Sequence, residues 1–145
     1  RPRAPSRRGW MVAAAAAVIA VALQLWGLYR PSSSHFGGWF PGADKVLHGV
    51  GFALPVILIA LAYTLRRRAA GSPPRIRVLV VVGWLFVVHA VVSELIQHAF
   101  YPLRSGDPLD VLADWIGIAV GGLAVWTIGY LRLTATRRVK VSARG

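Results

Sequence analysis

Four long apolar runs constrain this chain more than any other feature of its sequence. They cover residues 10–29, 46–65, 78–100 and 111–131. A helix rises about 1.5 Å per residue, so each run is long enough to cross a hydrocarbon core about 30 Å thick. Because lipid offers the backbone no hydrogen-bond partner, such spans are expected to be helical. The sequence therefore predicts an all-α polytopic membrane protein, a bundle of four transmembrane helices in a single domain over residues 1–145.

The basic residues are distributed unevenly among the connections. The chain has 17 Lys and Arg against 5 Asp and Glu, a formal net charge of +12. Fourteen of the 17 lie before residue 10, between residues 65 and 78, or after residue 131. Because basic loops stay in the cytoplasm, this alternation predicts that both termini are cytoplasmic. It also explains the charge without a nucleic-acid partner.

The first apolar run follows a basic start, as the core of a secretory signal peptide does. It is longer than such a core and ends in QLWGLYR at residues 24–30, without a small-residue cleavage site. We therefore expect it to be retained as a span. The chain has no Cys, which excludes disulfides and thiolate chemistry.

All five carboxylates fall on the side of the membrane opposite the basic connections. They are Asp44, Glu94, Asp107, Asp110 and Asp114, and Lys45, His48, Gln97 and Arg104 belong to the same layer. An ionisable group at membrane depth costs roughly 3 kcal/mol and is tolerated where it faces the bundle interior or a wet cavity. We therefore expect an inward-facing polar site near the outer surface, with a negative charge that suits a cationic or polar ligand.

Helical spacing groups the polar residues into faces. Positions 44 and 48 are four apart, Glu94 has Gln97 and His98 as its i+3 and i+4 neighbours, and positions 107, 110 and 114 are spaced three and four. Small residues and a proline continue two of these stripes toward the membrane centre. They predict close helix packing and a loosened backbone beneath the polar site. These packing residues are Gly51, Pro55, Gly117 and Gly121.

Several of these acids also have a simpler interpretation as helix caps. Asp107 precedes Pro108 and Asp110 lies in the turn that follows, so capping of the fourth helix accounts for Asp107 better than for Asp110. Asp44 suits a cap and a functional role equally. Glu94 and Asp114 lie too far inside their helices to be caps. For these two a functional site, or a polar clamp between helices, is the better explanation.

Metal binding and nucleophilic catalysis find less support. His48 and His98 offer imidazoles beside Glu94 and Asp110, a ligand set that zinc or iron accepts, but the paired HExxH or HxxxH spacing is absent. A GxSxG elbow and a Walker loop are absent too. We therefore predict no metal and no cofactor, and leave a metal at His48 and His98 as an open alternative. His89 and Gln24, inside the third and first runs, are expected to form helix-packing hydrogen bonds.

Three motifs, in order, resemble the VanZ-like family, which is named for a teicoplanin-resistance protein of Gram-positive bacteria. They are DKVLHGVGFAL at residues 44–54, SELIQ at residues 93–97 and RSGDPLDVLADWIGIAVGG at residues 104–122. The resemblance covers about residues 42–123. It assigns the family's pattern to Asp44, Lys45, His48, Glu94, Gln97, Arg104, Asp110, Gly117 and Gly121. Asp114 stands where Asn is usual, which makes this site more acidic.

The resemblance implies a multi-pass protein of the bacterial plasma membrane and cell envelope. It implies a link to glycopeptide (teicoplanin) resistance, or binding of a cell-wall precursor, a lipid-linked carrier or a glycopeptide, with membrane lipids as constant partners. Two other hypotheses stay open. One is a membrane enzyme acting on a lipid headgroup, with Glu94 or Asp114 as general base and His48 as acid. The other is a structural or assembly partner whose polar layer locks the helices together.

Overall fold

Four helices make up the part of the chain that the structure describes. The structure is a computed structural model and describes residues 7–30, 40–101 and 106–142, with side chains up to residue 127. The helices are α1 (Arg7–Tyr29), α2 (Ala43–Ala69), α3 (Ile76–Phe100) and α4 (Pro108–Ser142). All four are long and apolar enough to cross a membrane, α4 over Pro108–Thr127. Within the described residues, the predicted all-α fold with four helices of membrane-spanning length and composition is confirmed, and the helices extend beyond most of the predicted limits.

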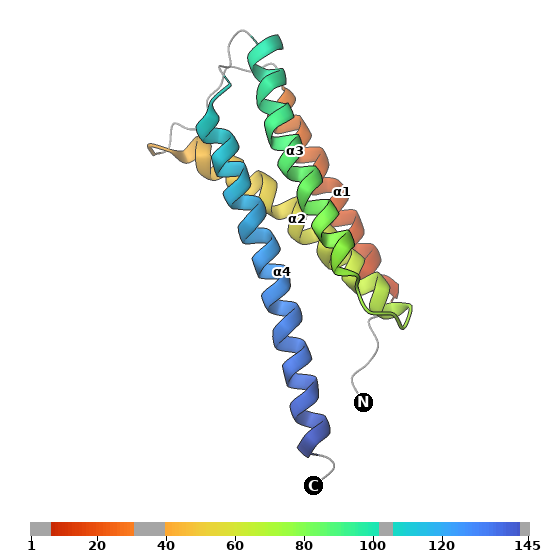
Figure 1. Cartoon of the computed structure of the whole chain (residues 1–145). Coiled ribbons are helices and arrows are strands. Elements are labelled where there is room, and N and C mark those ends of the chain that lie inside the picture. Colours follow the sequence, from red (N-terminus) through yellow and green to blue (C-terminus); the bar gives the residue numbers. More distant parts are fainter. Residues whose placement is uncertain (1–6, 31–39, 102–105, 143–145) are drawn as a thin grey trace.

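Successive helices run in opposite directions (Figure 1). The end of α1, the start of α2, the end of α3 and the start of α4 therefore lie on one side of the bundle, which we call the polar end. The opposite side, the basic end, holds the start of α1, the turn between α2 and α3, and the end of α4. Arg66, Arg67 and Arg68 lie in the last turn of α2 at the basic end.

The centre of the bundle is α2, which packs along both α4 and α1. Its buried Phe52 and Val56 form the core together with Leu28, Ala90 and Ile118 from the other three helices. Large apolar side chains such as Leu23, Trp84 and Leu95 are exposed on the outside. A soluble monomer rarely exposes so much apolar surface, whereas lipid solvates it. Four such helices make the chain a multi-pass membrane protein.

Glycines allow α2 and α4 to touch backbone to backbone. A Cβ built on Gly117 would overlap the carbonyl group of Gly49, and one on Gly121 would lie 3.0 Å from the Ala53 carbonyl oxygen. The predicted Gly51 does not take part, because a Cβ there would meet open space. Gly51 is two residues from Gly49 and so points to another side of the helix. The α2 glycine at this contact is Gly49.

Pro55, Gln24 and His89 are a proline and two polar residues that lie inside the spans. Pro55 is buried within α2, which continues as a helix through it although the proline has no N–H to donate. The predicted packing hydrogen bond of Gln24 is wrong, because both of its polar atoms are buried without a partner among the described residues; Nε2 of His89 is also buried without one. His89 packs instead among aromatic rings, with its ring centroid 5.6 Å from that of Phe52.

Candidate functional site

All five carboxylates of the chain gather at the polar end of the bundle. Asp44 lies in the first turn of α2, Glu94 near the end of α3, Asp107 just before α4, and Asp110 and Asp114 in its first two turns. The antiparallel order brings these three helix ends together, and Lys45 and His48 of α2 lie among the acids. We call these seven residues the polar cluster. The predicted Arg104 lies outside the described residues.

Lys45 joins the start of α2 to the start of α4. Its Nζ lies 2.5 Å from Oδ2 of Asp107, 2.5 Å from Oδ1 of Asp110 and 3.1 Å from Oδ2 of Asp44. The hydrogen bond from Lys45 lowers the pKa of Asp107 below its ordinary value. Three carboxylates thus share a single ammonium group. The two remaining acids of the polar cluster, Glu94 and Asp114, have other partners.

Asp107 connects the end of α3 to the start of α4. Its Oδ1 accepts a hydrogen bond of 2.9 Å from the Leu109 N–H, so the predicted N-cap is confirmed. Its own N–H donates to Oε2 of Glu94 at 3.0 Å. Asp44, by contrast, does not cap α2: the N-cap is Gly42, with φ +83° and no side-chain hydrogen bond. Asp44 is half exposed and pairs with Lys45.

His48 lies between two aspartates of α4. Its Nδ1 is 3.1 Å from Oδ1 of Asp114, and its Nε2 is 3.6 Å from Oδ2 of Asp110. Because a carboxylate only accepts, Nδ1 carries the hydrogen in the bond to Asp114. Asp114 is completely buried, and its Oδ2 has no hydrogen-bond partner. His48 is therefore held by Asp114 and turns Nε2 toward Asp110.

Glu94 brings the end of α3 into the polar cluster. The residue is only 5 % exposed, and its Oε1 is buried without a hydrogen-bond partner. Gly106 allows the chain before α4 to pass close to α3 at Glu94. A Cβ on residue 106 would lie 2.9 Å from the Glu94 carbonyl oxygen and 3.0 Å from Cβ of His98. We did not predict Gly106 from the sequence. The only signal was its place in the short RSGDP segment that leads into α4.

Three polar residues that follow Glu94 near the end of α3 do not join the polar cluster. Gln97, predicted for the site, donates from Nε2 to the Leu28 carbonyl oxygen at 3.0 Å and so ties α3 to α1. Tyr101 makes a similar tie, from its hydroxyl to the Tyr29 carbonyl oxygen at 2.8 Å. His98 is exposed. Gln97 thus supports the bundle beside the polar cluster.

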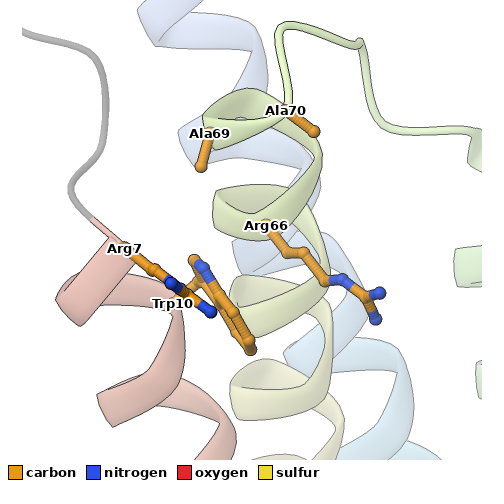
Figure 2. A pocket seen from close by; sticks show the side chains of 5 residues that line it. All are labelled: Arg7, Trp10, Arg66, Ala69 and Ala70. Atoms are coloured by element: carbon orange, nitrogen blue, oxygen red, sulfur yellow. The ribbon is translucent and has the colours of Figure 1, made fainter.

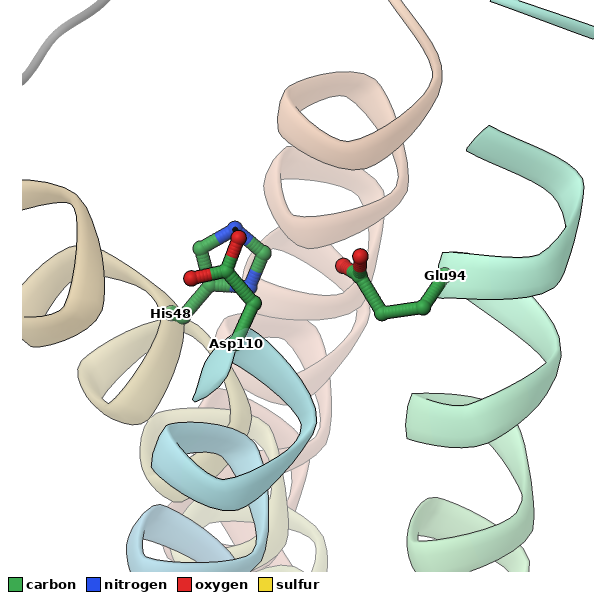
Figure 3. A group of neighbouring side chains, drawn as sticks. All are labelled: His48, Glu94 and Asp110. Atoms are coloured by element: carbon green, nitrogen blue, oxygen red, sulfur yellow. Dashed lines mark ion pairs between the residues drawn. The ribbon is translucent and has the colours of Figure 1, made fainter. Parts of the chain in front are cut away.

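Three side chains of the polar cluster point toward one another from three different helices. They are His48 of α2, Glu94 of α3 and Asp110 of α4 (Figure 3). One nitrogen or oxygen atom from each lies within 4.8 Å of the others. Such a group can accept hydrogen bonds, hold a cation or transfer a proton. The sequence analysis named these three residues together with His98 as a possible ligand set; the structure shows that His48 joins the group, while His98 is exposed.

A shallow pocket lies at the basic end, far from the polar cluster (Figure 2). It is lined by Arg7 and Trp10 of α1 and by Arg66, Ala69 and Ala70 at the end of α2. The Arg66 guanidinium lies 5.8 Å from the centroid of the Trp10 ring. Arginine beside tryptophan is typical of the zone where lipid headgroups meet the hydrocarbon core. The pocket contains no acid or histidine, so the polar cluster is the candidate functional site.

Comparison of the chain with protein-family models, with curated proteins and with solved structures finds no match in any of the three.

Proposed function

We propose that the chain is a VanZ-like protein of a bacterial plasma membrane, with both termini in the cytoplasm and the polar cluster facing the cell exterior. It binds there a cationic or hydrogen-bond-donating group of an envelope compound: a cell-wall precursor, a lipid-linked carrier or a glycopeptide. Resistance to teicoplanin is the cellular effect that we expect from such binding. The motifs at residues 44–54, 93–97 and 104–122 support the family.

The observation that carries the binding role is the uncompensated acid inside the polar cluster. Glu94 and Asp114 are buried, and each has one carboxylate oxygen without a hydrogen-bond partner. Buried polar atoms are almost always satisfied in native proteins, and each exception needs a reason. A ligand that brings a positive charge or a donor to the Glu94 oxygen supplies that reason for Glu94, whereas the completely buried Asp114 adds its charge from beside His48. A purely structural clamp would instead be expected to satisfy its own acceptors.

The proposed orientation predicts which end of the bundle is reached from outside the cell. Because the chain has no Cys, one introduced thiol reports one position. We expect a membrane-impermeant maleimide to label Pro41→Cys, at the polar end, in intact cells. It should label Ala70→Cys, at the basic end, only after the cells are lysed. Both positions are exposed, so access is decided by the membrane. Labelling of Ala70→Cys alone in intact cells would reverse the proposed topology.

Glu94→Gln is expected to separate ligand binding from folding. The amide oxygen can still accept the hydrogen bond from the Asp107 N–H, so the bundle should stay folded, while the charge is lost. A hydrogen bond to a charged group contributes about 1.5–3 kcal/mol, so the affinity of the purified protein for teicoplanin should fall about tenfold or more. Cells with Glu94→Gln, or without the chain, should become more sensitive to teicoplanin.

Asp44→Asn is the matched control for that experiment. It also removes one carboxylate from the polar cluster, but Asp44 is half exposed and pairs only with Lys45 among the described residues. We expect near-normal binding and susceptibility. Equal susceptibility of cells with and without the chain would argue against the resistance role, and unchanged teicoplanin affinity in Glu94→Gln would argue against this binding site.

One contact favours a second function, that of a membrane enzyme acting on a lipid headgroup. A histidine whose Nδ1 is held by a buried carboxylate has its Nε2 available for proton transfer, and His48 with Asp114 has this arrangement. Asp114 is too deeply buried to reach a substrate, so it would position His48 rather than act as the base. Turnover of labelled envelope lipid by the purified protein, lost in His48→Gln, would establish this function.

A further inference from the structure

We propose that His48, Glu94 and Asp110 bind a divalent transition-metal ion between α2, α3 and α4, and that zinc fits the site best. This inference deepens the proposed function and rests on it for treating the polar cluster as a binding site. It identifies the cation that the buried carboxylates hold. With the ion in place, an envelope compound would bind through an oxygen atom on the metal, and the ion itself takes the place of the cationic or donor group proposed above.

The spacing of the three side chains suits a metal ion. One ligand atom from each lies within 4.8 Å of the others. Two ligands on a tetrahedral zinc ion, each bonded at about 2.0–2.1 Å, lie about 3.4 Å apart. Nε2 of His48 and Oδ2 of Asp110 are 3.6 Å apart, too far for a strong hydrogen bond but close to that ligand spacing. The 4.8 Å limit exceeds that ligand spacing by about 1.4 Å, so side-chain movements of that size or less would bring all three atoms to zinc.

Each of the three proposed ligand side chains also forms a hydrogen bond through its other nitrogen or oxygen atom. Nδ1 of His48 bonds to Asp114, Oδ1 of Asp110 bonds to Lys45, and Oε2 of Glu94 accepts from the Asp107 backbone. In each case the second nitrogen or oxygen atom of the side chain stays available. Carboxylate–histidine pairs of this kind fix the ring orientation and tautomer of histidines that bind metals. The polar cluster therefore supplies both the ligands and the contacts that orient them.

The buried oxygen of Glu94 is a second observation that favours a cation at this site, and the buried charge of Asp114 beside His48 adds to it. Glu94 is 5 % exposed and Asp114 is 0 % exposed, yet Oε1 of Glu94 and Oδ2 of Asp114 have no partner among the described residues. Glu94 is directed toward His48 and Asp110 (Figure 3). Bringing two uncompensated carboxylates together in a low-dielectric environment is unfavourable. A bound dication would remove that cost.

The chemistry of the ligands favours zinc over magnesium or calcium. One imidazole and two carboxylates suit zinc and its first-row neighbours, whereas magnesium and calcium prefer oxygen ligands alone. Three protein ligands leave a fourth position on a tetrahedral ion. That position is where an oxygen of an envelope compound would bind. Lys45 bonds to Oδ1 of Asp110 and leaves Oδ2, the oxygen nearer to His48, to the ion.

Zinc binding can be measured directly on the full chain in detergent. After treatment with a chelator, we expect one zinc ion per chain to bind, with no competition from a large excess of magnesium. His48→Ala and Glu94→Gln should weaken zinc binding by at least about 100-fold, and Asp114→Asn, which removes only the contact behind His48, by about 10–100-fold. His98→Ala, an exposed histidine outside the polar cluster, is the matched control and should bind zinc like the original chain.

X-ray absorption of the zinc-loaded original chain tests the site without any variant. We expect one imidazole ligand, with the remaining ligands oxygen at about 2.0–2.1 Å. The inference is overturned if the original chain binds no zinc, if zinc has no imidazole ligand or more than one, or if His98→Ala removes binding while His48→Ala does not. This measurement also decides the question if the variants of the buried residues fail to fold.

The two proposals fail in different ways. Zinc binding with the expected ligands but without teicoplanin binding would leave the metal site standing and remove the envelope ligand. Teicoplanin binding that is equally strong with zinc and with chelator, together with no zinc bound, would remove the metal site and leave the proposed function. Loss of teicoplanin affinity on chelation, restored by zinc, would support both.

Discussion

Gly117→Ala is expected to lower the free energy of unfolding by about 3 kcal/mol or more. The added methyl group would coincide with the backbone carbonyl of Gly49, so α2 and α4 must move apart along their main contact. Extra atoms in a packed core cost about 1–3 kcal/mol when side chains can adjust, and backbone adjusts less easily. The separation would also move His48 away from Asp110 and Asp114. Thermal or denaturant unfolding of the purified protein in detergent measures the change.

Gly122→Ala provides a control on the same helix. A Cβ at Gly122 meets no atom within 4 Å, and the alanine gains the ordinary advantage of alanine over glycine in a helix, about 0.5–1 kcal/mol. We therefore expect unchanged or slightly raised stability. Equal stability of the two variants would show that α2 and α4 do not pack in the manner described.

The sequence predicted the spans and the acidic end of the bundle, because both depend on patterns that lie along the chain. Apolar runs of membrane length and alternating basic connections give the number of helices and their order. That order in turn places the start of α2, the end of α3 and the start of α4 together. The gathering of Asp44, Glu94 and Asp114 at one end follows from this antiparallel order alone.

The sequence could not predict the contacts that depend on how the helices are rotated and how closely they approach. Gly51 and Gly49 differ by about 200° around α2, and only the packing of α4 shows that Gly49 is the contact. Gln97 lies one turn from Glu94, yet it bonds to α1 rather than to the polar cluster. The sequence offered both His48 and His98 beside Glu94 and Asp110, and only the packing of the three helices shows that His48 is the histidine in the group.

Lys45→Met is expected to show how strongly the polar cluster depends on a single cation. The variant keeps the apolar length of the side chain but leaves Asp107 and Asp110 without their ammonium partner. Breaking a fully buried ion pair costs about 3–5 kcal/mol, and the Lys45 side chain is 29 % exposed, so we expect a loss of about 2 kcal/mol near neutral pH. Unfolding of the two proteins under identical conditions measures this difference.

The loss in Lys45→Met should depend on pH in a direction set by Asp107. Lys45 lowers the pKa of Asp107 in the folded chain, so its stabilising effect is present above the unfolded pKa. The effect disappears as the pH falls through the lower folded pKa, because a protonated carboxyl no longer needs the ammonium group. The stability of the two proteins should therefore converge in acid. Lys45→Met combined with Asp110→Asn should recover part of the loss at neutral pH, since one uncompensated charge is removed. A deficit that stays constant with pH, and is not reduced by the second substitution, would mean that Lys45 acts through packing rather than charge.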